Sequence, residues 1–260
     1  MPKDPVVILT REAGDNEELR ELLTSQGIEV KEYPCIRTTM TPWHSGEPIG
    51  GIPFADFDVV VFTSRRGVAG MKAAFPLPTG SRQLLAVVGT ATAKALAEQS
   101  GRTADIIAEP STAKGLAEIL VALPDITKDS KILHVRGNKS TGHFKEIITS
   151  HGFQLSELTV YRNETPQMTS LTRENQTRGI VVFASPSAAK GFMQYNKPLA
   201  DSGRLQYLAI GPVTARYLRK QGITGIHEAN QPNPRTLTEE VEKIIEITFK
   251  EGVRAADRRN

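Results

Sequence analysis

The chain has 260 residues, enough for two modest hydrophobic cores, and its 39% apolar and 23% charged residues are typical of a globular protein. A net charge of +3 is too small to indicate a nucleic-acid partner, although it suits an acidic small molecule. No apolar run is long enough to span a bilayer, and the first residues, MPKDPVVILT, lack the features of a signal peptide. We therefore expect a cytoplasmic protein that does not bind membranes.

The predicted elements alternate between apolar strands and amphipathic helices. In the first half of the chain we expect strands over 6–10, 28–35, 59–63, 84–88 and 106–107. Helices are expected around 19–23 with an end at Gly27, over 66–74, from Thr90, and after a cap at Ser111. Residues 37–53 are rich in Pro, Gly and Thr and have no clear period, which predicts a connection.

At Lys131 the pattern starts again, and the chain can be aligned with itself. The segment from Leu9 aligns without gaps with the segment from His134, and two later segments align at nearly the same offset, which stays between 121 and 125 residues. Chance similarity would not keep one offset through three segments, so we infer a duplicated α/β unit. The matched pairs include Arg11 with Arg136, Ser64 with Ser185, Gly89 with Gly211, and Thr92 with Thr214.

Strands that alternate with helices of ordinary length predict a doubly wound, flavodoxin-like parallel sheet in each of two domains. Ligands of such sheets bind beyond the carboxyl ends of the strands, where the turns into the helices gather. The repeated turns all follow strands in this way. The duplication therefore predicts a ligand cleft shared by the two domains.

These turns are rich in Gly, Ser and Thr, whose backbone amides and hydroxyls can hold carboxylates or phosphates, and nearby arginines can add bidentate contacts. Ser and Thr are also good helix caps, so a single hydroxyl is open to either interpretation, whereas the repeated set favours ligand binding. The candidate binding residues are Arg11, Thr63, Ser64, Arg66, Gly89, Thr90, Arg136, Gly137, Asn138, Ser185, Ser187, Gly211 and Thr214.

The familiar catalytic and metal-binding motifs are missing from the sequence. It contains no Walker motif, no G-x-G-x-x-G after a strand, no G-x-S-x-G, no H-E-x-x-H and no C-x-x-C, and its five histidines include no pair at helical ligand spacing. Cys35 is expected to be a small buried residue, and His134 a buried histidine with its hydrogen bonds satisfied. Any chemistry should therefore need neither a metal nor a strong nucleophile.

Tyr161 is the candidate acid, at the end of a predicted strand in TVYRNETP. A tyrosine at the rim of a sheet can be a packing residue with a solvated hydroxyl. Alternatively, a phenol that points into the site could donate a proton to a leaving hydroxyl.

In this order and spacing, FTS…R…G, VVGTATA, VRGN, TVYRN, FASPS and AIGPVTA resemble uroporphyrinogen-III synthase, over nearly the whole chain from Val6 to about Ile247. The resemblance implies a cytoplasmic, cofactor-free and usually monomeric enzyme. Such an enzyme closes the linear tetrapyrrole hydroxymethylbilane to uroporphyrinogen III, with loss of water and inversion of the last pyrrole ring through a spirocyclic intermediate. Because this bilane also cyclises spontaneously without inversion, the catalyst must mainly impose a geometry.

The resemblance also implies roles for individual residues. Tyr161 matches the family position proposed to help the hydroxyl leave, whereas Val213 replaces a threonine that some members carry. The substrate has eight carboxylates, and a transient contact with the preceding enzyme of the pathway is also implied. Family positions that line the cleft correspond here to Ser64, Arg66, Gly137, Asn138, Ser185, Ser187 and Thr214.

The internal repeat and the family resemblance predict different domain boundaries. The repeat alone predicts two consecutive domains that meet near Asp129. The resemblance implies instead a discontinuous domain, 1–36 with 166–260, and an inserted domain, 39–162. Hinge connections are then expected near 37–38 and 163–165.

Two other functions are compatible with parts of the sequence. A non-catalytic two-domain protein that binds an anionic metabolite would show a similar duplicated architecture. A nucleotide- or phosphosugar-dependent transferase is less favoured, because no acidic ribose ligand follows a phosphate loop at the usual distance.

Overall fold

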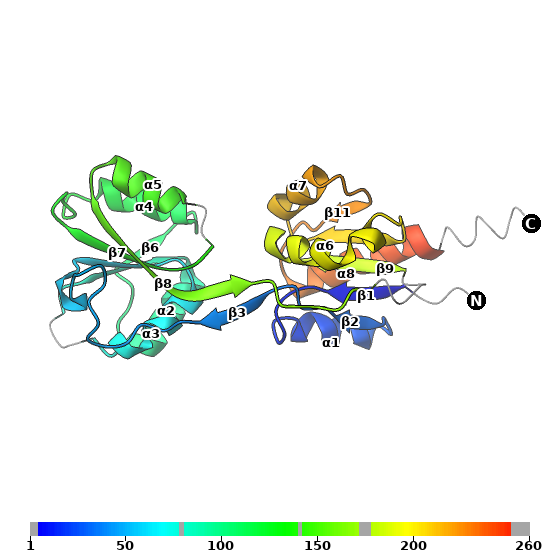
Figure 1. Ribbon diagram of the computed structural model, residues 1–260, viewed down its shortest axis with the longest axis horizontal. Coiled ribbons are helices and arrows are strands. Elements are labelled where there is room, and N and C mark those ends of the chain that lie inside the picture. Colours follow the sequence, from blue (N-terminus) through cyan, green and yellow to red (C-terminus); the bar gives the residue numbers. More distant parts are fainter. Residues whose placement is uncertain (1–4, 78–80, 140–141, 172–177, 251–260) are drawn as a thin grey trace, which may run out of the picture. The chain divides into compact units, whose positions relative to one another are not determined.

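The chain folds into two compact α/β units in the computed structural model, which describes residues 5–77, 81–139, 142–171 and 178–250 (Figure 1). Unit 1 consists of Met1–Arg37 and Glu164–Asn260, and unit 2 consists of Thr38–Asn163. Among the helices described, none has the length and apolar character needed to cross a membrane.

Unit 1 contains a five-stranded sheet in the order β11-β10-β9-β1-β2, whose neighbouring strands are all parallel. Its strands are β1 (Val6–Leu9), β2 (Val30–Glu32), β9 (Gly179–Phe183), β10 (Leu205–Ala209) and β11 (Ile226–Glu228). Its helices are α1 (Glu17–Ser25), α6 (Pro186–Ala200), α7 (Pro212–Lys220) and α8 (Pro234–Ile244), which continues as a π-helical turn over Ile245–Lys250.

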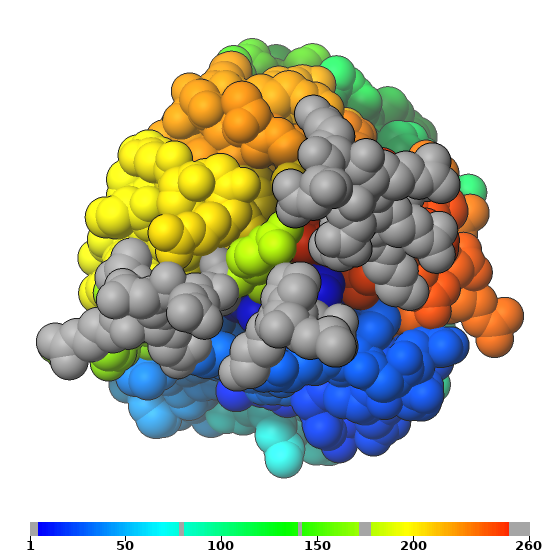
Figure 2. All heavy atoms as spheres, turned by 90° about the vertical axis from the view of Figure 1, so that its right-hand side faces the viewer, coloured from blue at the N-terminus to red at the C-terminus, as the bar shows by residue number. Residues whose placement is uncertain are grey.

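Helices cover both faces of the unit 1 sheet. On one face, Phe192 of α6 and Leu218 of α7 pack against the strands, and on the other face Leu23 of α1 and Val241 of α8 do so. The four side chains are fully buried. In Figure 2, blue residues from the early part of the chain lie below orange and red residues from its late part, and Leu23 and Val241 belong to one hydrophobic cluster, so segments far apart in the sequence build this unit.

Unit 2 contains a six-stranded sheet in the order β3-β8-β7-β4-β5-β6. Its strands are β3 (Arg37–Met40), β4 (Val59–Phe62), β5 (Leu84–Val88), β6 (Ile106–Ala108), β7 (Lys131–Gly137) and β8 (Gln154–Glu164). Its helices are α2 (Arg65–Gly70), α3 (Thr90–Ser100), α4 (Ala113–Ala122) and α5 (His143–Ser150), with short 3₁₀ turns at Phe54–Asp56 and Lys72–Ala74. Helices α2 and α3 pack on one face of the sheet, and α4 and α5 pack on the other.

The two sheets have equivalent strand orders. Without its edge strand β3, the unit 2 sheet reads β8-β7-β4-β5-β6, and each of these strands corresponds in the repeat to one of β2-β1-β9-β10-β11. This is the flavodoxin-like order, and it confirms the predicted α/β fold with parallel sheets.

Three local expectations were wrong. The second strand is limited to Val30–Glu32, and Pro34, which lacks an amide donor, lies within the expected extension. The predicted connection begins with strand β3, which pairs with β8. Helix α4 is capped by Thr112, whose hydroxyl accepts from the Gly115 N–H at 2.9 Å, rather than by Ser111.

Strands β3 and β8 carry the chain between the two units. Strand β3 begins at Arg37, the last residue of the first segment of unit 1, and β8 ends at Glu164, the first residue of its second segment. The Thr38 hydroxyl donates to Asn163 Oδ1 at 2.9 Å. Both crossings of the chain are therefore held by the same strand pair.

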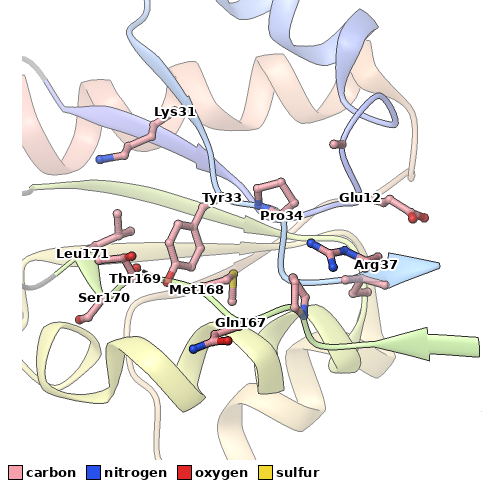
Figure 3. A pocket seen from close by; sticks show the side chains of 13 residues that line it. Glu12, Lys31, Tyr33, Pro34, Arg37, Gln167, Met168, Thr169, Ser170 and Leu171 are labelled. Carbon is pink, nitrogen blue, oxygen red and sulfur yellow. Dashed lines mark hydrogen bonds between the residues drawn. The ribbon is translucent and has the colours of Figure 1, made fainter. Parts of the chain in front are cut away.

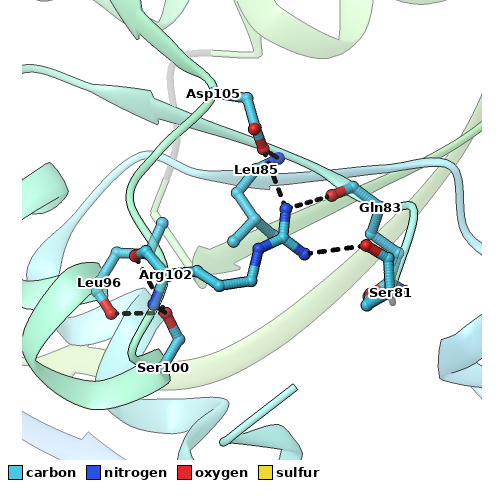
Figure 4. A network of polar contacts seen from close by, with 7 residues as sticks. All are labelled: Ser81, Gln83, Leu85, Leu96, Ser100, Arg102 and Asp105. Atoms are coloured by element: carbon cyan, nitrogen blue, oxygen red, sulfur yellow. Dashed lines mark hydrogen bonds and ion pairs between the residues drawn. The ribbon is translucent and has the colours of Figure 1, made fainter. Parts of the chain in front are cut away.

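A polar network closes the amino end of β5 in unit 2 (Figure 4). Arg102 donates to the Gln83 carbonyl at 2.9 Å and to Asp105 at 3.3 Å, while Asp105 accepts from the Leu85 N–H at 2.8 Å. This network lies at the end of the strand opposite the turn at Gly89. It therefore stabilises the sheet away from the predicted binding turns.

Candidate functional site

The predicted turns of unit 2 gather at one edge of its sheet. In the parallel register, Phe62 of β4 pairs with Val87 of β5 and Val135 of β7, so the turns that follow these strands leave the sheet at its carboxyl edge. These turns contain Thr63, Ser64, Gly89, Thr90, Gly137 and Asn138. The structure therefore brings together the unit 2 candidates that follow strands.

Ser64 and Tyr161 meet at this edge. The Ser64 hydroxyl lies 3.1 Å from the Tyr161 hydroxyl and also accepts from the Gly67 N–H at 3.0 Å, as the N-cap of α2. Tyr161 is partly buried. A candidate acid and a candidate binding residue are thus in direct contact.

A bulge in β8 brings Tyr161 opposite Gly137. Arg136 of β7 pairs with Thr159, but the next pair is Gly137 with Tyr161, so Val160 is an extra residue in β8. A Cβ atom added to Gly137 would overlap Cε2 and Cζ of the Tyr161 ring and lie 2.9 Å from its hydroxyl oxygen. Only a glycine leaves room for the ring at this position.

Asn138 is fixed by Asn163, a residue that the sequence pattern does not single out. The Asn163 N–H donates to Asn138 Oδ1 at 2.8 Å, and the Asn138 N–H donates to the Tyr161 carbonyl at 3.1 Å. The turn after β7 is therefore attached to the end of β8. The repeat offers no signal for this contact, because Asn138 corresponds to Ala13.

Arg136 contacts a partly buried carboxylate, Glu157, which was also missed. Its guanidinium donates to Glu157 Oε1 at 2.6 Å and to the Gly137 carbonyl at 2.9 Å, and Lys145 donates to Glu157 Oε2 at 2.9 Å. Partial burial opposes ionisation of Glu157, but the hydrogen bonds from Arg136 and Lys145 lower its pKa below the ordinary value. In the repeat, Lys145 corresponds to Arg20 and Glu157 to Glu32, and Arg20 and Glu32 also form an ion pair, at 3.7 Å. This matched pair of opposite charges is a sequence signal from which Glu157 could have been identified.

His134 is buried as predicted, but its hydrogen bonds are not all satisfied. Its Nε2 lies 3.3 Å from the Thr63 hydroxyl, whereas its buried Nδ1 has no hydrogen-bond partner among the residues that the structure describes and lies 3.8 Å from Glu157 Oε1. Burial lowers the pKa of His134 from 6.5 to about 4, because the nearby Glu157 carboxylate only partly offsets the desolvation. His134 is therefore neutral at physiological pH and braces Thr63.

The turn into α3 begins with a backbone conformation that favours glycine. Gly89 has φ of 76°, and a Cβ added there would lie 3.0 Å from the Ser111 hydroxyl. Thr90, the first residue of α3, and Arg66 in α2 are exposed.

In unit 1 the corresponding turns also gather at a carboxyl edge. Leu9 of β1 and Ala209 of β10 pair with Val182 and Phe183 of β9, so the turns that contain Arg11, Ser185 and Gly211 follow neighbouring strands. Ser185 caps α6 by accepting from the Ala188 N–H at 3.1 Å. Ser187 is partly buried in the first turn of α6.

Three unit 1 candidates differ in how accessible they are. Arg11 is partly exposed and lies 3.9 Å from Asp15. Gly211 has an extended backbone with φ of 174°, and a Cβ added there would meet no atom within 4 Å. Thr214 is only 3% exposed, and its repeat partner Thr92 only 5%, so both threonines lie on the inner side of their helices.

The two copies differ in chemistry although they share a scaffold. At the repeat positions of Gly137 and Tyr161, unit 1 carries Glu12 and Ile36. The phenol therefore occurs in one copy, whereas the capping serine occurs in both.

A cavity of about 580 Å³ lies within unit 1, beside the two chain crossings (Figure 3). None of the residues predicted as binding or catalytic lines it. Its lining consists of Glu12 and Ala13 from the turn after β1, of Lys31, Tyr33, Pro34, Ile36 and Arg37, and of all residues from Pro166 to Leu171. The Tyr33 hydroxyl in its wall donates to the Thr169 carbonyl at 2.8 Å and accepts from Asn196 at 3.0 Å.

The carboxyl edges can bind anions and donate a proton. Backbone amides, hydroxyls and arginines can donate hydrogen bonds to an anion there, and the Tyr161 phenol is the candidate proton donor. Within the described part of the chain, no cluster of three or more His, Cys, Asp or Glu side chains is arranged to hold a metal ion.

Comparison with known proteins gives one consistent result. The model of a family described as uroporphyrinogen-III synthase HemD matches residues 17–239. A chloroplastic uroporphyrinogen-III synthase of Oryza sativa subsp. japonica is 24% identical over 257 residues, which cover 96% of this chain and 83% of the relative. A uroporphyrinogen-III synthase of Chlorobaculum parvum is 37% identical over 107 residues, or 38% of this chain and 43% of the relative.

Solved structures show the same fold. Uroporphyrinogen-III synthetase from Helicobacter pylori 26695 superposes with a TM-score of 0.62 at 19% identity, covering 93% of this chain and all of that one. A mutant uroporphyrinogen III synthase from Thermus thermophilus gives a TM-score of 0.59 at 17% identity, with 98% and 100% coverage.

Proposed function

The chain belongs to the uroporphyrinogen-III synthase family, and we propose that it closes linear hydroxymethylbilane to uroporphyrinogen III with loss of water and inversion of the last pyrrole ring. The main support for this function is the family match. It extends over residues 17–239 and so covers parts of both units. Because a hydroxyl leaves as water while a ring closes, the enzyme is a carbon–oxygen lyase.

The test supplies freshly made hydroxymethylbilane and separates the product isomers. The proposal predicts mainly the inverted isomer, formed faster than in a control without protein. A non-catalytic protein that binds an anionic metabolite would instead leave only the non-inverted isomer, formed at the spontaneous rate, and that result would overturn the proposal.

We propose that Tyr161 is the catalytic residue. Its phenol donates a proton to the leaving hydroxyl, which departs as water, and the proton that the ring carbon later loses restores the phenol. Its position supports this role, since the hydroxyl is partly buried and lies at the carboxyl edge with the Ser64 hydroxyl 3.1 Å away.

The turns at both carboxyl edges are proposed to bind the substrate's carboxylates. The capping serines, Ser64 and Ser185, and the turns at Gly89 and Gly211 combine hydroxyls with backbone N–H groups, a combination that suits anions. The remaining proposed contacts are Arg11, Thr63, Arg66, Thr90, Arg136, Gly137, Asn138 and Ser187. Thr214, whose side chain is buried, would contact the substrate through its backbone N–H in the first turn of α7. His134 and Glu157 act indirectly, by bracing Thr63 and Arg136.

We further propose that the crossings near 37–38 and 163–165 are hinges between a discontinuous domain, 1–36 with 166–260, and an inserted domain, 39–162. The division of the chain into compact units after Arg37 and after Asn163 supports this proposal. A cytoplasmic location and a transient contact with the enzyme that supplies the bilane stay predictions, and the name of the rice relative places that protein in the chloroplast.

A further inference from the structure

We propose that Ser64 is a positioning residue for Tyr161: its hydroxyl donates a hydrogen bond to the phenol oxygen and thereby directs the phenol proton toward the substrate. This inference rests on the proposed proton donation by Tyr161. It assigns the single hydroxyl proton of Ser64 to the phenol, so that the turn after β4 contacts the substrate through its backbone N–H groups rather than through this hydroxyl.

The contacts of the two hydroxyls are compatible with donation from Ser64 to Tyr161. The Ser64 oxygen accepts from the Gly67 N–H at 3.0 Å and lies 3.1 Å from the Tyr161 oxygen. In the described part of the chain, Ser64 has no other side-chain hydrogen bond, and Tyr161 has none except that with Ser64. Since the N–H occupies one lone pair of Ser64, its single proton can point at the phenol oxygen, which leaves the phenol proton free.

The backbone holds both oxygens in place. Ser64 has extended dihedral angles, φ −163° and ψ 155°, directly after the buried strand β4, and its cap fixes the first turn of α2. Tyr161 lies on β8, which is separated from β4 by β7, so the phenol reaches Ser64 by crossing Gly137 of β7. The contact therefore joins two strands that are not neighbours, and it exists because Gly137 has no side chain.

The second copy of the repeat separates capping from positioning. Ser185 has nearly the same dihedral angles, φ −165° and ψ 159°, and the same cap hydrogen bond, to the Ala188 N–H at 3.1 Å. The repeat position of Tyr161 is Ile36, so Ser185 has no phenol to hold. Capping explains a serine in both copies, whereas the contact with a phenol is specific to Ser64.

The experiment measures kcat and KM for the inverted isomer in the full-length protein and its variants. We expect Ser64→Ala to lower kcat about tenfold, the effect of one lost hydrogen bond, with KM within about twofold. Ser64→Thr keeps the hydroxyl and should restore kcat to within about threefold. In a Tyr161→Phe background, Ser64→Ala should change kcat by less than about twofold, because no phenol proton remains to be directed.

Thr112→Ala is the matched control for the loss of a helix cap. Thr112 caps α4 through the Gly115 N–H at 2.9 Å and is not among the site residues, so this variant should leave kcat within about twofold of the parent. If Ser64→Ala does not fold, Ser64→Gly replaces it, since glycine is nearly as good an N-cap.

The inference would be overturned by an unchanged kcat in the variant that lacks the Ser64 hydroxyl, or by an equal loss of kcat with and without the phenol. A rise in KM alone would make Ser64 a substrate contact and would likewise overturn it. The failure of the proposed function is a separate outcome, because the parent protein itself would then form only the non-inverted isomer.

Discussion

The ring of Tyr161 lies directly over Gly137, and a Cβ atom at Gly137 would overlap two of its ring carbons. Position 137 therefore controls where the phenol is placed. We predict that Gly137→Ala lowers kcat at least about tenfold and destabilises the fold by about 1–3 kcal/mol, the usual cost of overpacking. Steady-state kinetics and urea unfolding check both effects.

The control for this prediction is Tyr161→Ala, which removes the ring. In that background, Gly137→Ala should cost less than about 0.5 kcal/mol, because the added methyl group then has space. An unfolding cost of the same size with and without the ring would show that the overlap with Tyr161 is not its cause.

Gly89 and Gly211 are equivalent in the repeat but should respond differently to alanine. Gly89 has φ of 76° and Gly211 has φ of 174°, an extended value that any residue adopts. We predict that Gly89→Ala destabilises the protein by about 1–2 kcal/mol, whereas Gly211→Ala leaves the unfolding free energy within about 0.5 kcal/mol and raises KM. Thermal unfolding and kinetics of both variants test this pair, and an unchanged KM for Gly211→Ala would remove that turn from the substrate contacts.

Burial of His134 should make stability depend on pH. Its pKa is lowered from 6.5 to about 4 in the folded protein, so between these values the unfolded chain binds more protons. Stability must therefore fall as the pH falls through this window, by about 2 kcal/mol between pH 7.5 and pH 5. Urea unfolding of the parent and of His134→Gln, which cannot titrate there, should give curves that diverge below pH 6.5. Parallel curves would contradict the assigned pKa.

The network at the amino end of β5 should stabilise the fold without affecting the reaction. Arg102 donates to the Gln83 carbonyl and to Asp105, far along the strand from the turn at Gly89. We predict that Arg102→Ala lowers the unfolding free energy by about 1–2 kcal/mol and leaves kcat and KM unchanged at a temperature where the variant is folded. A large loss of kcat in the folded variant would show that the two ends of the strand are coupled.

The sequence predicts best the elements whose pattern is local. The strand Leu84–Val88 was predicted at its observed bounds because it is a short, buried apolar run that ends at a glycine. Strand β3 was missed, because three of its four residues, Arg37–Met40, are exposed and its strand geometry depends on β8, more than a hundred residues later. The duplication was detected in the sequence because the two copies align at a nearly constant offset. The two sheets indeed share an equivalent strand order.

The contacts within the candidate site could not be predicted in this way. Ser64 and Tyr161 are 97 positions apart, and their contact depends on a bulge at Val160 that no local pattern signals. The unsatisfied Nδ1 of His134 likewise follows from how Glu157 is shared with Arg136 and Lys145. Sequence reasoning identified the residue types at the edge, and the structure determines which of them touch.

Turnover by Tyr161→Phe tests the central claim most directly, because phenylalanine keeps the ring over Gly137 and removes only the hydroxyl. With freshly made hydroxymethylbilane and separation of the isomers, we expect kcat for the inverted isomer to fall about 100-fold, the lower range for loss of a general acid. The unfolding free energy should change by less than about 1 kcal/mol, since the lost hydrogen bond is partly exposed. A kcat within about twofold of the parent would contradict proton donation by Tyr161.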